Sequence, residues 1–255
     1  GMPFGDSSAL PTYYVSKLAA EDITVALSGD AGDENFAGYN RYGIDRTLGR
    51  LGRVPNPLLT LGYVTLDAVP APYRSKKTLR WPRKAFEYAR TDPDTRYALI
   101  RCHAYGDEID DFWAGPVPED EFADIRAALA AADGPTRLDH LLQTDLATYL
   151  PDDILVKVDR ASMAHSLEVR SPFLDHEVVE YAARIPARYK RREGTGKWIL
   201  KEAFRDLLPD RILDRDKQGF GIPANEWFRG GLSGLADSHM ERLGNRQPFV
   251  RSELN

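Results

Sequence analysis

The sequence predicts a mostly α-helical chain that keeps one or two β-strands. Residues 23–27, Ile-Thr-Val-Ala-Leu, form a β-branched and apolar run that is long enough for a buried strand and too short for a helix. After Tyr42 the apolar residues recur at helical spacing almost throughout, as is typical of amphipathic helices. One such stripe comprises Leu138, Leu141, Leu142, Leu146 and Tyr149. The segment around residues 23–27 is therefore the only clear α/β signal in the chain.

The predicted elements follow in order along the chain. Two serines cap a helix over about residues 9–20, which ends just before the strand. A second helix follows the strand, because Phe36, Tyr39 and Tyr42 recur at helical spacing. Apolar or helical segments are then expected over residues 58–69, 75–90, 94–105 and 121–132, with an acidic surface loop at 107–120.

Prolines are expected to interrupt the helical pattern at two later points. Pro82 falls inside a helical stretch, where its ring removes a backbone donor. Pro151 follows the leucine stripe, and Asp152 and Asp153 then open a further helix, since carboxylates are favoured in a first turn. We therefore expect a break at each proline.

Composition and charge limit the possible functions. Hydrophobic residues make up 42% of the 255 residues and charged residues 29%, as is typical of globular proteins. The net charge of −5 and the dispersed basic residues indicate no nucleic-acid surface, and no apolar run is long enough to span a bilayer. The single cysteine, Cys102, excludes an internal disulfide and a cysteine-based metal site, which favours a cytoplasmic protein. The N-terminal Gly-Met-Pro-Phe lacks the features of a signal peptide, and we expect a piece of a longer protein.

The stretch Ser-Gly-Asp-Ala-Gly-Asp-Glu, residues 28–34, is the first candidate site and is called the acidic corner below. A strand that turns on glycine into a helix is where open α/β sheets bind ligands. Two glycines allow an anion to approach the backbone, whereas three carboxylates would repel a phosphate unless Mg²⁺ bridged them. A nucleoside triphosphate with Mg²⁺ meets both conditions. The alternative is that Asp30 caps the helix while Asp33 and Glu34 occupy its first turn.

Two further groups of charged residues are candidates for substrate contact. Lys157, Asp159 and Arg160 alternate with residues that look buried, so they either pair internally or bind a substrate. Lys197 follows a loop rich in glycine at the start of a predicted helix. A lysine delivered there suits a phosphate in transfer, and an ordinary surface lysine is the alternative.

Six segments, taken together and in their order along the chain, indicate a protein family. They are Pro-Phe-Gly-Asp-Ser-Ser-Ala-Leu-Pro-Thr-Tyr (3–13), Ala-Leu-Ser-Gly-Asp-Ala-Gly-Asp-Glu (26–34), Phe-Ala-Gly-Tyr (36–39), Tyr-Leu-Pro-Asp-Asp-Ile-Leu-Val-Lys-Val-Asp-Arg (149–160), Ser-Leu-Glu-Val-Arg-Ser-Pro-Phe-Leu-Asp (166–175) and Lys-Trp-Ile-Leu-Lys (197–201). Together they resemble the synthetase domain of glutamine-dependent asparagine synthetases and related amidotransferases. The resemblance runs from Pro3 to about Phe228, and the combination is far more specific than any one segment.

The resemblance implies an α/β core of the adenine-nucleotide α-hydrolase type. In that family ATP, with Mg²⁺, adenylates a side-chain carboxylate and releases pyrophosphate. Ammonia derived from glutamine then attacks the acyl-adenylate to give an amide. Residues 1–45 would be the remaining part of the nucleotide-binding core, 46–145 a helical region, and 146–255 the helical C-terminal part of the synthetase domain.

The resemblance also implies roles for residues at matching positions. Asp30 matches a carboxylate implicated in forming the adenylate and in handling protons, and Asp33 matches one that binds Mg²⁺ and pyrophosphate. Lys197 would stabilise charge at the phosphates. The implied site residues are catalytic Asp30 and Lys197, ATP-binding Ser28 and Gly29, metal-binding Asp33, and substrate-binding Glu34, Lys157 and Arg160.

The sequence departs from the family pattern in two ways. The family's first nucleotide-binding loop, Ser-Gly-Gly-x-Asp-Ser, does not occur, and Cys102 is internal, so it is not the N-terminal nucleophile of a glutaminase domain. We therefore expect an inactive piece of a longer amidotransferase, whose apolar edges would allow a homodimer. The alternatives are a non-catalytic helical binding module, and a related synthetase acting on a larger carboxylate such as a β-lactam precursor or a cell-surface sugar acid.

Overall fold

Helices dominate the computed structural model, which describes residues 5–70, 77–102, 105–106, 109, 113–215 and 221–244. The predicted fold class is confirmed, because the described part of the chain has many helices and a single sheet of two strands, β1 (Val25–Leu27) and β2 (Glu168–Arg170). The α-helices are α1 (Ala9–Ala19), α2 (Gly32–Asn35), α3 (Asn40–Leu51), α4 (Asn56–Asp67), α6 (Lys77–Ala89), α7 (Pro93–Arg101), α9 (Ala123–Ala131), α10 (Arg137–Ala147), α11 (Val156–Met163), α12 (His176–Arg184), α13 (Ala187–Lys190), α14 (Trp198–Ala203), α15 (Asp210–Leu213), α16 (Ala224–Arg229) and α17 (Ser233–Gly244). A π-helix spans Leu150–Leu155 and a 3₁₀-helix spans Pro172–Leu174.

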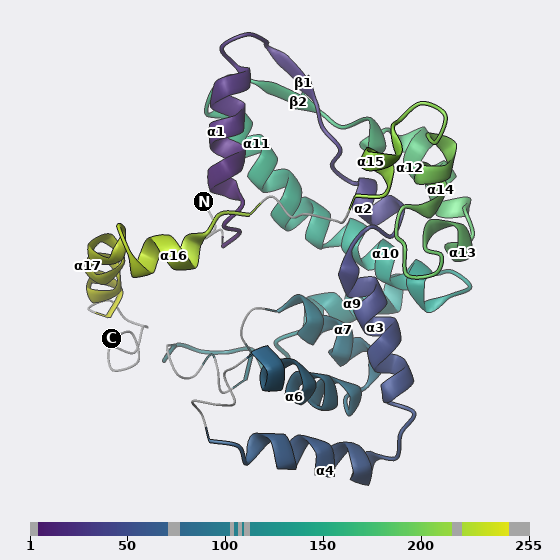
Figure 1. Ribbon diagram of the computed structural model, residues 1–255, viewed down its shortest axis with the longest axis vertical. Helices are drawn as coiled ribbons and strands as arrows, with labels where there is room; N and C mark the ends of the chain where they lie inside the picture. The colour runs from purple at the N-terminus through teal and green to yellow at the C-terminus, as the bar shows by residue number, and fades with distance from the viewer. Residues whose placement is uncertain are drawn as a thin grey trace.

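α11 and α10 run diagonally through the upper half of the view, and α6 and α4 lie below them (Figure 1). At one end α1 packs beside α11, and at the other α4 packs against α6. The main core cluster lies between α3, α7, α9 and α10, and its buried members include Tyr97, Leu141 and Leu142. The predicted leucine stripe is thus confirmed as a core-facing surface of α10.

The two strands are parallel and come from distant parts of the chain. Val25 pairs with Glu168 and Leu27 pairs with Arg170. The prediction that the first strand is buried is wrong, because the Leu27 residue is 74% exposed. A sheet of two strands is too small to form a covered core of its own, and β2 packs beside α11.

Three predicted helix boundaries differ from those in the structure. The helix expected across Phe36 and Tyr42 is two helices, because Ala37 has a φ of 56° between α2 and α3. Pro82 lies inside α6 without ending it. Pro151 lies in the π-helix between α10 and α11, where the wider turn accommodates a proline ring that would clash in an α-helix.

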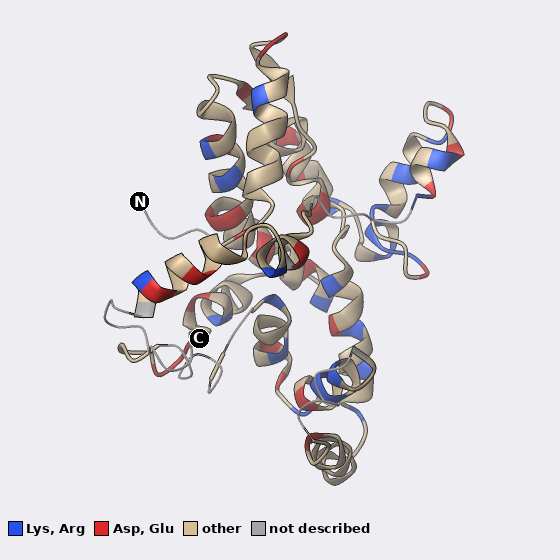
Figure 2. Ribbon diagram, turned by 60° about the vertical axis from the view of Figure 1, so that its left-hand side comes forward, with Lys and Arg blue, Asp and Glu red and all other residues tan. Residues whose placement is uncertain are grey.

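Charged residues of both signs are scattered along the ribbon among uncharged stretches (Figure 2). Among the described residues, no helix is long and apolar enough to cross a bilayer. Residues 75–76 and most of 107–112 lie outside the described ranges, so the start of one predicted helix and much of the acidic loop stay predictions.

Candidate functional site

Two hydrogen bonds hold the acidic corner against the end of β2, and a third lies within the corner. The backbone N–H of Ser28 donates to the carbonyl oxygen of Arg170 at 2.8 Å, which extends the strand pairing by one residue. The hydroxyl of Ser171 donates to the carbonyl oxygen of Asp30 at 2.6 Å. The hydroxyl of Ser28 donates to the Asp30 carboxylate at 2.7 Å, so this side chain has a defined direction.

The helix that follows the corner is a single turn. Its N-cap residue is Ala31, which has a φ of 63° and makes no side-chain capping bond. The alternative that Asp30 caps the helix is therefore wrong, since its carboxylate accepts from Ser28 instead. Asp33 and Glu34 do occupy the first turn. A left-handed alanine costs roughly 1–2 kcal/mol relative to glycine, a strain that is common at functional sites.

Lys197 and Asp33 meet in space although they are far apart in the sequence. The Lys197 Nζ lies 2.8 Å from the Asp33 Oδ1, and both side chains are partly exposed, at 35% and 21%. The Lys197 backbone N–H donates to the carbonyl oxygen of Phe36 at 2.8 Å, and its φ is 54°. The tertiary structure thus places the lysine amine on the first turn of α2.

Two glycines make this close approach possible. A Cβ on Gly38 would lie 1.8 Å from the Asp33 Oδ1 and 2.5 Å from the Lys197 Cε. A Cβ on Gly196 would lie 2.3 Å from the carbonyl oxygen of Ala37. Any larger residue at either position would push the lysine loop away from the acidic corner.

Glu34 points away from this pair into the protein. Its residue exposure is 1%, and its carboxylate accepts a hydrogen bond of 2.8 Å from the Tyr39 hydroxyl. Burial raises the pKa of Glu34, and the hydrogen bond from Tyr39 offsets this only in part. The side chain borders a cavity of about 30 Å³ that is also lined by Asp139 and Lys190. That volume has room for about one water molecule beside the Glu34 side chain.

A buried charge network supports Tyr39 from behind. The Arg41 guanidinium lies 4.0 Å from the ring centre of Tyr39 and 4.1 Å from that of Tyr149. Its Nε donates to Asp145 at 2.9 Å, and Asp145 is fully buried. Asp145 therefore orients Arg41, and Arg41 in turn packs on the tyrosine that bonds to Glu34.

The other predicted substrate residues lie on α11. Lys157 donates to the Asp6 carboxylate at 2.6 Å and to the Ser8 hydroxyl at 2.8 Å, so it joins α11 to the start of α1. Burial opposes ionisation of Asp6, but the bonds from Lys157 and Ser8 outweigh it and lower the pKa of that carboxyl. Asp159 and Arg160 are exposed, and neither forms an ion pair within the described residues. The structure thus brings Asp33 and Lys197 together and holds Lys157 in a different pair.

The donor set at the corner suits a metal only with help from a ligand. Within the described ranges no three histidine, cysteine or acidic side chains come together as a metal cage. Mg²⁺ commonly uses one or two carboxylates together with water and phosphate oxygens. Asp33 fits that pattern as a single hard oxygen ligand whose side chain is partly exposed.

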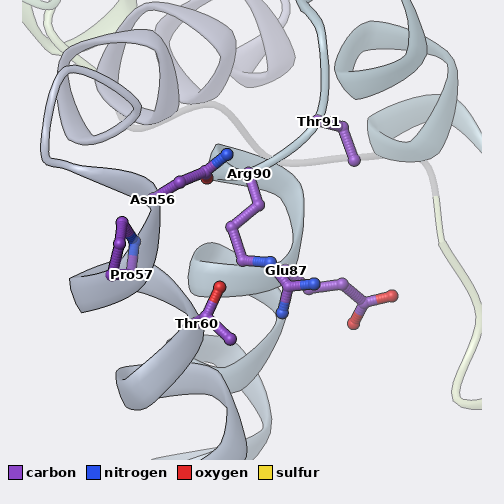
Figure 3. A pocket seen from close by; sticks show the side chains of 6 residues that line it. All are labelled: Asn56, Pro57, Thr60, Glu87, Arg90 and Thr91. Carbon is purple, nitrogen blue, oxygen red and sulfur yellow. The ribbon is translucent and has the colours of Figure 1, made fainter.

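One large hollow lies far from the acidic corner. It has a volume of about 620 Å³ and lies between the start of α4 and the end of α6, where Thr60 and Arg90 point toward one another (Figure 3). Its lining contains no residue of the acidic corner, so size alone does not identify the functional site.

Several supporting residues lie in the matching segments, but no pattern in the sequence assigned them a role. Ser171, Gly38 and Tyr39 contact the corner or its carboxylates, yet each occupies an ordinary turn or aromatic position in the chain. Their places in the matching segments 36–39 and 166–175 were the only pointers to them. Their roles depend on contacts that follow from tertiary packing.

Comparison with known proteins gives a consistent result. The model of the protein family described as asparagine synthase matches residues 1–254. Glutamine-hydrolyzing asparagine synthetase 1 of Bacillus subtilis (strain 168) is 31% identical over 235 residues, which cover 91% of this chain and 36% of that protein. Asparagine synthetase 3 of the same organism is 27% identical over 237 residues, covering 91% and 31%. The chain thus spans about a third of the length of these curated relatives. A shorter match, to the asparagine synthetase of Rattus norvegicus, is 40% identical over 82 residues, covering 29% and 15%. No solved structure matches the chain significantly.

Proposed function

The chain belongs to the asparagine synthase family, and on that premise we propose that the acidic corner and Lys197 form one wall of a site that adenylates a carboxylate with ATP. The contact of 2.8 Å between Asp33 and Lys197 is the observation that carries the proposal. In the proposed reaction a carboxylate oxygen of the acceptor attacks the α-phosphorus of ATP. The bond from that phosphorus to the bridging oxygen breaks, and pyrophosphate leaves with the electron pair.

Lys197 and Asp33 have complementary roles in this step. Negative charge grows on the departing pyrophosphate, and an amine held at a defined position stabilises such charge without reorganising. Asp33 would hold Mg²⁺ when pyrophosphate or ATP supplies further oxygens, and the metal would neutralise phosphate charge. Ser28 and Gly29 precede this turn on an open backbone, since a Cβ on Gly29 would meet nothing within 4 Å. They are the proposed ATP contacts.

Asp30 is the proposed proton acceptor in the second step. Ammonia attacks the acyl carbon, AMP leaves, and one proton passes from the nitrogen to a base. The Ser28 hydroxyl holds the Asp30 carboxylate in one direction, as such a role requires.

For the acceptor we propose a small carboxylate such as aspartate, with ammonia supplied from glutamine by a glutaminase domain in a cytoplasmic enzyme. Arg160 is the exposed candidate for contact with the acceptor. Lys157 would have to leave Asp6 and Ser8 to take part. Glu34 is proposed to support the corner through Tyr39.

The test is ATP–pyrophosphate exchange with aspartate, using the full-length protein that carries this sequence. Asp33→Asn and Lys197→Met should each lower the exchange rate by about 10²–10³, the usual loss for one preorganised electrostatic contact. Lys17→Met removes an exposed lysine from α1 and is the matched control, which should exchange at the normal rate. Folded Lys197→Met protein with unchanged exchange would refute the assignment. An acceptor panel in the same assay separates aspartate from larger carboxylates.

This chain alone is expected to release negligible pyrophosphate from ATP, because its sequence has no Ser-Gly-Gly-x-Asp-Ser loop. Turnover by the purified chain would contradict that expectation.

A further inference from the structure

Two adjoining hollows lie between α3 and α13, behind the turn that follows the acidic corner. Their volumes are about 530 Å³ and about 700 Å³. Both are lined by Arg46, Arg191 and Glu193, so the two hollows meet at these three side chains and are described together as one depression. Ligand pockets for small molecules commonly have volumes of roughly 300–1,000 Å³.

The walls of this depression are strongly basic. Six arginines line it against two acidic residues, although the whole chain has a net charge of −5. We call the depression the arginine groove, and its arginines are Arg46, Arg50, Arg137, Arg188, Arg191 and Arg192.

The two carboxylates of the groove are already engaged. Asp45 is buried and lies 3.2 Å from the Arg96 Nε and 3.8 Å from the Arg137 Nε. Glu193 lies 3.6 Å from Arg192 on an exposed turn. The four other arginines of the groove form no ion pair with any carboxylate of the described residues; they are Arg46, Arg50, Arg188 and Arg191.

Arg191 is held in place without a counter-charge. Its Nη1 donates to the carbonyl oxygens of Ala37 and Tyr39 at 3.3 and 3.4 Å. Its guanidinium also lies against Gly43, where a Cβ would come within 2.6 Å of the Nη2. Burial and the neighbouring charge of Arg46 lower the pKa of Arg191. The charges of Arg46 and Arg191 repel one another, and a bound anion would relieve this repulsion.

The floor of the groove adds an apolar surface. Leu141 and Tyr42 are buried members of the main core, and both line the 530 Å³ hollow together with Leu138 and Ala187. A guanidinium presents a planar set of N–H donors that matches the oxygens of phosphate or carboxylate. A phosphate group with two negative charges binds two guanidinium groups more readily than a singly charged anion does.

We propose that the arginine groove binds a small organic molecule carrying phosphate groups, with its phosphates between Arg46 and Arg191 and its organic part over Leu138 and Leu141. The contacts of the groove differ from those of Lys197, since Arg191 bonds to the carbonyl oxygens of Ala37 and Tyr39 and the Lys197 N–H bonds to that of Phe36. The proposal does not depend on the adenylation chemistry, because the site uses none of its residues.

The test is calorimetric titration of the chain with inorganic tripolyphosphate at about 0.1 M salt, where distant surface charges are screened. Arg46→Glu should weaken binding by about tenfold or more, because it removes a charged hydrogen-bond donor and adds repulsion. Arg46 is exposed and has no ion pair within the described residues, so the variant is expected to fold. Arg53→Glu makes the same change of charge beyond the end of α3, outside the groove lining, and is the matched control.

Each outcome decides the proposal. Binding that Arg46→Glu weakens and Arg53→Glu leaves within about twofold supports it. Equal weakening by both variants would show general charge attraction and overturn it, as would no measurable binding of tripolyphosphate. Titration with citrate separates the two anion chemistries, because binding tighter than that of tripolyphosphate would overturn the choice of phosphate. Arg192 lies 4.9 Å from the ring centre of Trp198, so tryptophan emission that changes on binding, and no longer does so in Trp198→Phe, locates the ligand independently.

Discussion

Replacement of Asp145 by asparagine is expected to be among the most destabilising single changes in this chain. Asp145 is fully buried, and its Oδ2 accepts hydrogen bonds from Tyr42 at 2.7 Å, Tyr97 at 2.6 Å and the Arg41 Nε at 2.9 Å. Its Oδ1 faces the Arg101 Nη1 at 3.5 Å. The substitution keeps the shape of the side chain but removes the charge that balances Arg41.

The expected magnitude follows from the burial of both partners. The Arg41 side chain is 14% exposed, so it would be left as a nearly buried cation without a counter-ion. Breaking such a pair on one side typically costs about 3–5 kcal/mol. A domain is usually stable by about 5–15 kcal/mol, so the variant should be marginally folded.

The assay is urea denaturation followed by far-UV circular dichroism, with the midpoint and slope compared between variants. Glu180→Gln is the control, because it removes a partner from an exposed pair at 3.8 Å with Arg184 and should change stability by less than about 0.5 kcal/mol. Adding Arg41→Met to Asp145→Asn should restore part of the loss, since it removes the unbalanced charge. An Asp145→Asn variant that loses less than about 1 kcal/mol would refute the reasoning.

Three further changes probe the acidic corner and its surroundings. Ser166 has a φ of 56° after the end of α11, where the Leu167 N–H bonds to the Ser162 carbonyl oxygen as in a Schellman turn. Ser166→Gly should therefore raise the free energy of unfolding by about 0.5–1 kcal/mol. A lower melting temperature in thermal unfolding would contradict this. Because the pKa of Glu34 is raised in the folded protein, its protonation stabilises the fold at low pH, and this stabilisation is lost as the pH rises through the raised pKa. The stability of Glu34→Gln relative to wild type should therefore increase between the ordinary glutamate pKa and the raised one. A stability difference that does not depend on pH would count against this reasoning. Gly38→Ala should suppress pyrophosphate exchange in the full-length protein, because the added Cβ collides with the Asp33 carboxylate. Normal exchange would mean that the contact between Asp33 and Lys197 is dispensable.

Much of the local structure was predictable from the sequence. The strand and the glycine turn at the acidic corner follow from chain-local preferences, as does the leucine stripe of α10, because period and turn chemistry act over a few residues. The same signals failed at Pro151 and Ala37. At Ala37 a tertiary contact competes with helix propensity, since its carbonyl accepts from Arg191 and lies against Gly196.

The composition of the candidate site was predictable in part. Asp33 and Lys197 were each expected to act on phosphates, and the structure puts their side chains in contact. Glu34 was expected near a substrate, which stays a prediction, and the structure adds that the residue is buried and bonded to the Tyr39 hydroxyl. No pattern in the sequence distinguishes a first-turn glutamate that faces solvent from one that faces the core.

The sequence by itself therefore determined the helical character, the acidic corner and the family to which the chain belongs, because all three reside in short stretches of residue types. Only the tertiary structure decided which charges meet. Lys197 reaches Asp33, Lys157 pairs with Asp6, and Asp145 holds Arg41, each across a long separation in the chain. Such pairings are set by how helices pack around a shared core, and the free energy of a buried charge makes the right partner obligatory once packing has brought it within reach.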